Sequence, residues 1–156
     1  MNMEIERKYL VNNSRWQGLF NPVDAIFVQQ AYLSADPECT VRIRVTETEA
    51  FITIKGKSQG ISREEFEYTV PFSDGLDILR LAGTAIIMKR RYAVSYKGFN
   101  WEVDEFLGDN EGLILAEVEL NEDTENPEWP DWIDQEVSGD RRYYNLQLAL
   151  HPIKSW

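Results

Sequence analysis

The chain has 156 residues, 43% of them hydrophobic, and a formal net charge of −11 at pH 7. This length suits one domain over residues 1–156 with a sizeable core, and no apolar run reaches membrane-spanning length. The overall acidity opposes nonspecific binding to nucleic acid or to an anionic membrane. The single cysteine, Cys39, excludes an internal disulfide. Since no signal-peptide pattern is present either, we expect a cytoplasmic protein.

Alternating polar and apolar residues predict eight strands. They are expected near residues 3–11, 26–33, 39–47, 50–57, 61–70, 86–96, 99–107 and 113–120. Ser73 can cap a helix that runs to about residue 82 and stops at Gly83. The side chains that this helix is expected to bury are Leu76, Leu79 and Ile78. Further short helices are expected at 14–20, 131–137 and 145–150, and a turn at 109–112.

Charged residues recur two positions apart along seven of these strands, beginning with Glu4, Glu6 and Lys8. Residues two apart lie on the same face of an extended strand. The other members of this ionic face are Arg42, Arg44, Lys55, Lys57, Arg63, Glu65, Glu67, Lys89, Arg91, Glu102, Asp104, Glu117 and Glu119. Together they hold eight basic and eight acidic side chains, so the rest of the chain accounts for the whole net charge.

On a single strand, such alternation usually marks the solvent-facing side of an ordinary antiparallel sheet. Repetition over seven strands favours another interpretation, because acidic pairs and basic pairs fall on different strands. Adjacent like charges repel unless something binds between them. We therefore expect a site for a highly charged anion together with metal ions. Eight antiparallel strands can close into a barrel, and the ionic face points inward if helices cover the apolar outside.

Several segments resemble the CYTH superfamily of triphosphate tunnel metalloenzymes, and the resemblance spans nearly the whole chain. The first is the Glu-x-Glu-x-Lys start formed by Glu4, Glu6 and Lys8. The others are Gln30-Ala31-Tyr32-Leu33, Arg42-Ile43-Arg44, Thr53-Ile54-Lys55, Ser62-Arg63-Glu64-Glu65-Phe66-Glu67, Lys89-Arg90-Arg91-Tyr92, Glu102-Val103-Asp104, Glu117-Val118-Glu119, and the group Asp140, Arg142, Tyr143 and Asn145. Ala31 stands where glycine is common, and Arg90 should point out of the barrel; both leave substrate preference open.

The resemblance implies an α+β, mainly β fold: a closed eight-stranded antiparallel barrel with a few helices packed outside. It also implies metal-dependent hydrolysis of triphosphates, and the branch most similar in length and motif is that of bacterial inorganic triphosphatases. Lys8 and Tyr32 are then a candidate catalytic pair that positions water and the terminal phosphate, although Tyr32 can equally be a packed residue at the tunnel mouth. Residues 143–150 can plug or border one end, or simply pack on the barrel.

The residue types fit this chemistry. A triphosphate carries about four to five negative charges near neutrality, so several cations must surround it. The expected substrate-binding residues are Lys8, Arg42, Arg44, Lys55, Lys57, Lys89 and Arg91. The expected ligands of Mg²⁺ or Mn²⁺ are Glu4, Glu6, Glu117 and Glu119, which offer hard carboxylate oxygens. The expected supporting residues are Arg63, Glu65, Glu67, Glu102 and Asp104, which can hold a second metal, orient basic side chains or balance charge.

Three functions fit the sequence. The leading one is hydrolysis of tripolyphosphate to pyrophosphate and phosphate, with water as the nucleophile. The second is thiamine-triphosphatase, nucleoside-triphosphatase or adenylate cyclase activity on the same fold, although no segment clearly supplies a pocket for base and ribose. The third is a non-catalytic polyphosphate-binding module, against which the paired carboxylates argue. The expected partner is a small-molecule triphosphate, with no nucleic acid or membrane, and the protein is expected to be a monomer or homodimer.

Overall fold

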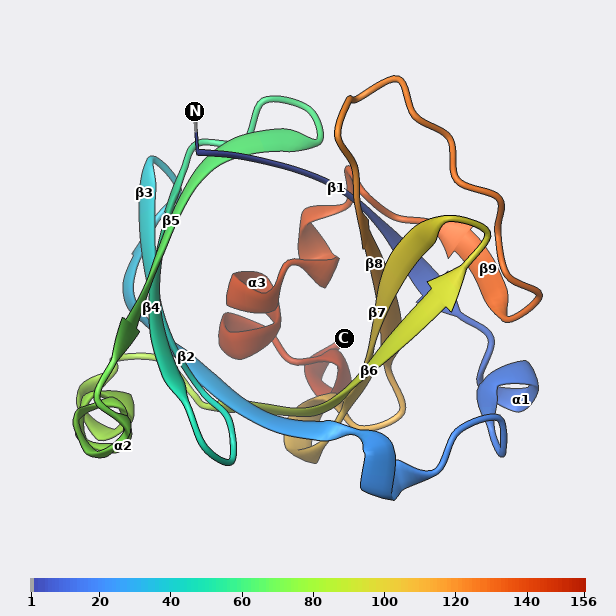
Figure 1. The fold of residues 1–156 in the computed structure, drawn as a ribbon. Helices are drawn as coiled ribbons and strands as arrows, with labels where there is room; N and C mark the ends of the chain where they lie inside the picture. Colours follow the sequence, from blue (N-terminus) through green and yellow to red (C-terminus); the bar gives the residue numbers. More distant parts are fainter. Residues whose placement is uncertain (1) are drawn as a thin grey trace.

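The computed structural model describes residues 2–156 and shows a strongly curved antiparallel sheet that closes into a ring (Figure 1). Its strands are β1 (Met3–Val11), β2 (Ile26–Asp36), β3 (Cys39–Val45), β4 (Ala50–Gly56), β5 (Ser62–Val70), β6 (Ile87–Tyr96), β7 (Phe99–Phe106), β8 (Ile114–Glu119) and β9 (Ile133–Glu136). The spatial order is β5-β4-β3-β2-β6-β7-β8-β1-β9. All eight predicted strands are confirmed.

Strand β1 closes the ring because it has two neighbours. Its first part, residues 3–5, pairs with β5, and residues 6–10 pair with β8. Where β1 leaves β5, its free edge is covered by β9, whose Ile133 lies opposite Val11. The helix predicted at 131–137 is therefore wrong. An unpaired edge exposes backbone donors and acceptors, and this segment satisfies them as a strand: the Val137 amide donates to the Lys8 carbonyl at 2.8 Å.

Three α-helices and four short 3₁₀ turns complete the chain. They are α1 (Asn13–Trp16), α2 (Phe72–Leu81), α3 (Asn145–Leu150), η1 (Pro22–Asp24), η2 (Gly108–Asn110), η3 (Arg141–Tyr143) and η4 (Ile153–Ser155). The helix at 145–150 and the turn at 109–112 are confirmed, whereas α1 is shorter than expected. Ser73 is not the cap of α2, because the helix begins one residue earlier, after Pro71. Among residues 2–156, no helix combines the length and the apolar character needed to cross a membrane.

The apolar side chains of the strands point outward and are covered there. Beside β1, β6, β7 and β8 lies an aromatic cluster in which Trp16 of α1 contacts Tyr92 and Trp132. On the other side, α2 packs Leu79 against Ile43 and Ala50 of β3 and β4. Leu76 was expected to be buried with Leu79 but is 40% exposed, whereas Gly75 and Leu79 are the residues of α2 buried against the sheet. With its apolar face covered from outside, the ring turns its ionic face inward.

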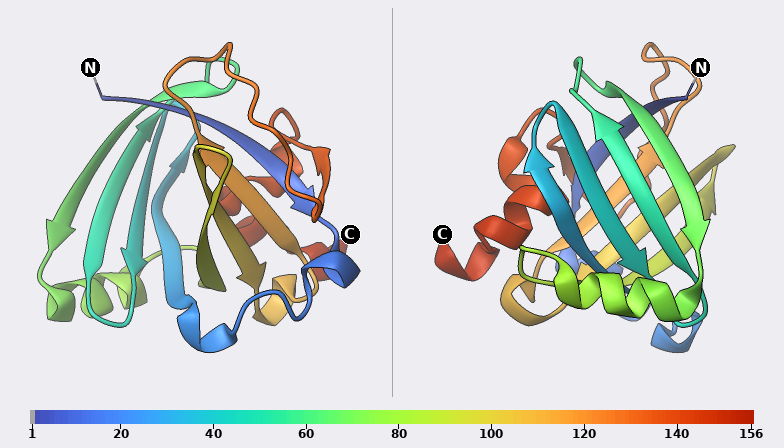
Figure 2. Two further views of the ribbon diagram at one scale, coloured as in Figure 1. Left: turned by 45° about the vertical axis from the view of Figure 1, so that its right-hand side comes forward. Right: turned by 90° about the vertical axis from the view of Figure 1, so that its left-hand side faces the viewer.

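Helix α3 does not pack outside the ring but borders one end of it, one of the two positions that the sequence left open for residues 143–150. Viewed along the ring, α3 lies across its opening (Figure 1), and the view turned by 90° places it at one end (Figure 2). Its buried Leu148 packs with Ile87, Phe106 and Leu115. Because this apolar side rests on the strand ends, the first residues of α3 border the interior of the ring.

The close approach of α2 to the sheet requires a glycine. A Cβ atom added at Gly75 would lie 2.2 Å from the Cβ of Ala50 and 3.5 Å from Val45 Cγ2. We expect Gly75→Ala to lower the free energy of unfolding by about 1–2 kcal/mol, because overpacking outweighs the ~1 kcal/mol gain in helix propensity. Urea denaturation checks this. The matched control is Gly83→Ala, where the added Cβ meets nothing within 4 Å. Equal stability of the two variants would contradict the prediction.

Candidate active site

The ring encloses a cavity of about 340 Å³ whose wall is the ionic face. Every predicted site residue lines this cavity except Asp104. The lining members are Glu4, Glu6, Lys8, Tyr32, Arg42, Arg44, Lys55, Lys57, Arg63, Glu65, Glu67, Lys89, Arg91, Glu102, Glu117 and Glu119. The charged members of this set come from seven strands, β1 and β3–β8, and converge only because the sheet closes, so the inward parity of the sequence pattern is confirmed.

One wall is acidic and is formed by β1, β7 and β8. Their register places Glu6 opposite Glu119, and Glu117 opposite both Lys8 and Glu102. Burial, then the neighbouring carboxylates of Glu117 and Glu4, raise the pKa of Glu6 to about 8. Burial and the carboxylates of Glu4 and Glu102 also raise the pKa of Glu119. This wall thus concentrates more negative charge than its own cations offset.

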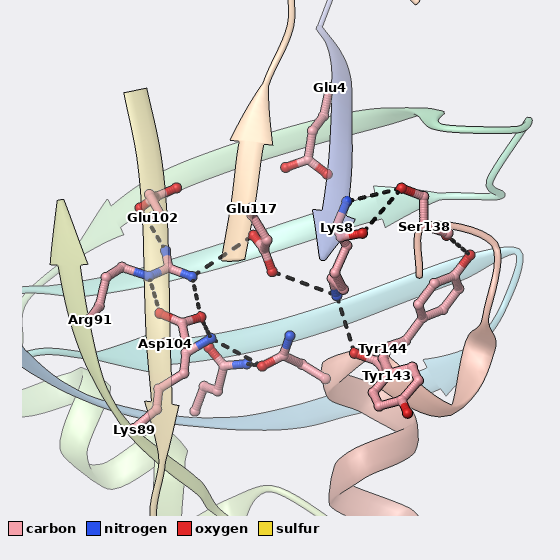
Figure 3. Close-up of polar contacts among 12 residues, drawn as sticks. Glu4, Lys8, Lys89, Arg91, Glu102, Asp104, Glu117, Ser138, Tyr143 and Tyr144 are labelled. Carbon is pink, nitrogen blue, oxygen red and sulfur yellow. Dashed lines mark hydrogen bonds and ion pairs between the residues drawn. The ribbon is translucent and has the colours of Figure 1, made fainter. Parts of the chain in front are cut away.

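Glu117 differs from Glu6 because cations surround it. Burial alone would raise its pKa, but Lys8 and Arg91 outweigh burial and lower the pKa to about 2. The Lys8 Nζ lies 3.6 Å from Glu117 and the Arg91 guanidinium 4.0 Å from it (Figure 3). Near neutral pH, Glu117 is therefore ionised while Glu6 retains a proton, although both line the same cavity.

The carboxylates of the acidic wall fit a hard divalent cation by their chemistry. Oxygen donors from Glu4, Glu6, Glu117 and Glu119 are the type that Mg²⁺ and Mn²⁺ prefer, and a cation would relieve the repulsion that raises the pKa of Glu6. Within residues 2–156, however, no three acidic, histidine or cysteine side chains already converge at ligand distance. The wall supplies the charge and the donor atoms, and the carboxylates must turn toward an ion to coordinate it.

The opposite wall, formed by β3, β4 and β5, is rich in cations. Lys55 lies between Glu4, at 3.0 Å, and Glu65, at 3.2 Å. Burial and Arg42 would lower the pKa of Lys55, but the carboxylates around it leave that pKa raised. Arg44 forms an ion pair with Glu67 across the strands. Glu65 and Glu67 therefore hold basic side chains in place, one of the roles that the sequence left open.

Two arginines of this wall carry buried donors that meet no protein acceptor. Arg42 donates to Thr53 Oγ1 and Arg63 donates to Thr40 Oγ1, each through Nη2 at 3.1 Å. In the part of the chain that the structure describes, the buried Nε atoms of both arginines have no hydrogen-bond partner. A buried donor without an acceptor lowers the stability of the folded protein. A bound anion would supply the acceptors that these two Nε atoms lack. The sequence pattern did not single out Thr40 or Thr53 as site residues, although they have the same parity along their strands as Arg42 and Lys55.

Asp104 holds the cations of β6 from behind. It is 1% exposed and accepts two hydrogen bonds from Arg91, both at 2.8 Å, while Lys89 Nζ lies 2.8 Å away (Figure 3). Burial would raise the pKa of Asp104, but Arg91 and Lys89 keep it well below its usual range. Arg91 also donates to Glu102 at 2.9 Å. Since Asp104 does not line the cavity, it orients Arg91 and Lys89 and balances their charge.

Lys8 and Tyr32, the two candidate catalytic residues, both line the cavity. Among residues 2–156, which the structure describes, no hydrogen bond joins their side chains. Lys8 is 7% exposed, and its Nζ donates to the Tyr143 carbonyl at 3.2 Å and lies 5.5 Å from the Tyr144 ring centre. Tyr32, on β2, is 8% exposed. The aromatic neighbour of Lys8 is Tyr144, which the sequence analysis missed because its position depends on the tertiary fold.

Lys57 lies at the mouth of the cavity. It follows the last residue of β4 and pairs at 3.3 Å with Glu38, and the two side chains are 65% and 67% exposed. An exposed pair is weak and strongly screened by salt. Lys57 is thus placed where an anion would enter, whereas Lys55 and Arg42 line the cavity further inside and are less exposed.

Comparison with known proteins identifies the domain. A family model described as the CYTH domain matches residues 2–144. The chain belongs to the CYTH family. This CYTH domain is 41% identical over 157 residues to an inorganic triphosphatase of Acetivibrio thermocellus, covering 100% of this chain and 99% of that protein. It is 33% identical over 151 residues to an inorganic triphosphatase of Nitrosomonas europaea, covering 94% and 97% of the two chains.

The fold is shared as well. A crystal structure described as an inorganic triphosphatase superposes on this CYTH domain with a TM-score of 0.64 at 30% identity, covering 94% of each chain. The ring of strands thus belongs to a fold seen by experiment in a related protein. The family resemblance drawn from Glu4, Glu6 and Lys8 onward is confirmed.

Proposed function

We propose that this CYTH domain hydrolyses inorganic tripolyphosphate to pyrophosphate and phosphate inside the tunnel, in a reaction that depends on Mg²⁺ or Mn²⁺. The observation that carries the proposal is the pair of buried, unpartnered Nε donors of Arg42 and Arg63, within the described residues 2–156, facing a wall of crowded carboxylates. Such opposed walls suit a ligand that brings phosphate oxygens to one side and a divalent cation to the other. The relatives described as inorganic triphosphatases support the same substrate.

In this proposal, the basic wall binds and orients the phosphates. The Nε atoms of Arg42 and Arg63 donate to phosphate oxygens, and Lys55, released from part of its pairing with Glu4, adds a point charge. Arg91 and Lys89, held by Asp104, bind the end of the phosphate chain that lies nearest α3. When bound to Glu4, Glu6, Glu117 and Glu119, the divalent cation offsets phosphate charge and makes the attacked phosphorus more electrophilic.

The nucleophile is water. In residues 2–156 the sole cysteine, Cys39, is exposed, and it is absent from the cavity lining, as is the sole histidine, His151. Lys8 holds an ammonium group beside Glu117 and Tyr143, where it can orient water and the terminal phosphate, with Tyr32 as its candidate partner. The same proposal places the protein in the cytoplasm as a monomer or homodimer, with no nucleic-acid or membrane partner.

A substrate panel tests the proposal. Tripolyphosphate, ATP and thiamine triphosphate are incubated with the protein, each with Mg²⁺, with Mn²⁺ and with excess chelator, and phosphate and pyrophosphate release are measured. We expect the highest kcat/KM on tripolyphosphate and loss of activity in chelator. Full activity in chelator would refute metal dependence. Preference for ATP or thiamine triphosphate would favour the second function class, and binding without turnover would favour a polyphosphate-binding module.

A further inference from the structure

The stretch from Tyr143 to Asn145 reaches two lysines that come from different strands of the tunnel. The Lys8 Nζ of β1 donates to the Tyr143 carbonyl at 3.2 Å. The Lys89 Nζ of β6 donates to Asn145 Oδ1 at 3.0 Å. Tyr143 and Asn145 thus supply one acceptor to each lysine at the end of the cavity that α3 borders. Packing on the barrel does not require these contacts.

Lys89 has a fixed number of donors, and its surroundings use two of them. The side chain is 1% exposed but lines the cavity, and its ammonium carries three N–H bonds. One is directed to Asp104 Oδ2 at 2.8 Å and a second to Asn145 Oδ1 at 3.0 Å. With both acceptors in place, the remaining N–H has one direction available and can be aimed at a ligand in the cavity.

Gln30 fixes which atom of Asn145 faces the lysine. Gln30 is 0% exposed, and its Nε2 donates to the same Asn145 Oδ1 at 2.9 Å. Asn145 Oδ1 thus accepts from both the Lys89 ammonium and the Gln30 amide. If the Asn145 amide turned by 180°, its NH₂ group would face these two donors, and neither hydrogen bond could form. Gln30 does not line the cavity. Its side chain is therefore placed to act on Lys89 through Asn145.

The helix that carries Asn145 is itself held in place. Asn110, between β7 and β8, is 4% exposed. Its Nδ2 donates to the Leu148 carbonyl of α3 at 3.3 Å, and its Oδ1 accepts from the Ile153 amide at 2.9 Å. The position of Asn145 along the tunnel axis is thereby set by buried hydrogen bonds on both of its sides, from Gln30 within the ring and from Asn110 behind the helix.

From these contacts we propose that Asn145, oriented by Gln30, is a positioning residue that aims the Lys89 ammonium at the bound phosphate. The inference rests on the proposed triphosphatase function, in which Lys89 contacts substrate. Without Asn145 the ammonium keeps its contact with Asp104 but loses its second constraint. Attraction of the anion then changes little, whereas the alignment that matters in the transition state is lost.

The test is kinetic. We expect Asn145→Leu, which keeps the volume and removes the acceptor, to lower kcat on tripolyphosphate about tenfold while KM changes less than about threefold. Gln30→Met is expected to act in the same direction but more weakly. Leu150→Gln, at an exposed position of the same helix, is the matched control and should match wild type. If Asn145→Leu fails to fold, Asn145→Ala removes the same acceptor with a smaller side chain. Unchanged kcat in the folded variant would overturn the proposal.

A double-mutant cycle separates positioning from other roles. If Asn145 acts through Lys89, Asn145→Leu should cost less than about twofold in a Lys89→Met background. Direct phosphate binding by Asn145, or a general loosening of α3, would instead give additive losses, and either result would overturn the inference. Calorimetric binding of tripolyphosphate is the companion measurement: since Asn145 adds alignment and little affinity, Asn145→Leu should change Kd less than about threefold, and a larger loss of affinity would overturn the inference. A wild-type protein that binds tripolyphosphate without cleaving it would refute the proposed function and this inference with it, whereas an active wild type with unchanged kcat in Asn145→Leu would overturn the inference alone.

Discussion

Arg91→Ala is expected to lower kcat/KM for tripolyphosphate by about a hundredfold, because a hydrogen bond to a charged group is worth up to ~3 kcal/mol. Arg91 lines the cavity, and Asp104 and Glu102 fix the direction of its guanidinium. The substitution also leaves Asp104 with Lys89 as its remaining cationic contact at hydrogen-bond distance, so we expect a lower melting temperature as well. Steady-state kinetics and thermal denaturation measure the two effects.

Arg90 is the matched control for Arg91. It is the adjacent residue of β6, it has the same charge, and it is exposed on the outer face of the ring opposite Glu105. Arg90→Ala removes the same unit of positive charge and should change kcat/KM less than about twofold, because long-range attraction is screened by salt. Equal losses at the two positions would show that net charge, and not the inward direction of Arg91, governs activity.

This pair also illustrates what strand parity predicts well. A strand exposes alternate residues on opposite faces, so the spacing within Arg42/Arg44 and Lys89/Arg91 is enough to assign each pair to one face. Closure of the ring then brings those faces together, and the outward apolar residues confirm the choice of face. Lys57 also lines the cavity as its parity predicts, but it lies beyond the end of β4 at Gly56, and its side chain is 65% exposed where that of Lys55 is 17% exposed.

The parts of the site that escaped prediction depend on packing between distant segments. The apolar residues at 132, 133 and 137 have a spacing compatible with a helix. Residues 133–136 form a strand because they pair with the open edge of β1. Asn145 was singled out in a C-terminal motif, but its contact with Lys89 was not predicted, nor was the place of Tyr144 beside Lys8. Both depend on a short segment whose position is set by Asn110 and Gln30, far away in the sequence. Local patterns carry no information about such contacts. Asp104 has the parity of a lining residue, but only the structure shows that two cations cover it.

Glu6→Gln is expected to abolish most metal-dependent activity and yet to stabilise the metal-free protein at alkaline pH. The folded protein raises the pKa of Glu6 from 4.5 to about 8, so the fold favours the protonated carboxyl. The metal-free wild type should therefore lose stability as pH rises from 4.5 through 8, by no more than about 5 kcal/mol in total. Glutamine cannot ionise, so the variant should lack this loss.

Addition of Mg²⁺ should reverse the order of the two proteins. A cation that binds the Glu6 carboxylate must displace its proton below pH 8, so metal stabilises the wild type more at about pH 8.5 than at about pH 6. In Glu6→Gln the Mg²⁺-induced rise in melting temperature should be small at both pH values.

Glu64→Gln, at an exposed position on β5, is the matched control and should behave as wild type. An equal rise in Glu6→Gln and wild type at the higher pH would remove Glu6 from the metal site. A stability gain in metal-free Glu6→Gln without a loss of Mg²⁺-induced stabilisation would show only that Glu6 is buried among other carboxylates. If Glu6→Gln both gains stability without metal and loses the stabilisation by Mg²⁺, the carboxylates of the acidic wall destabilise the metal-free fold and bind the cation.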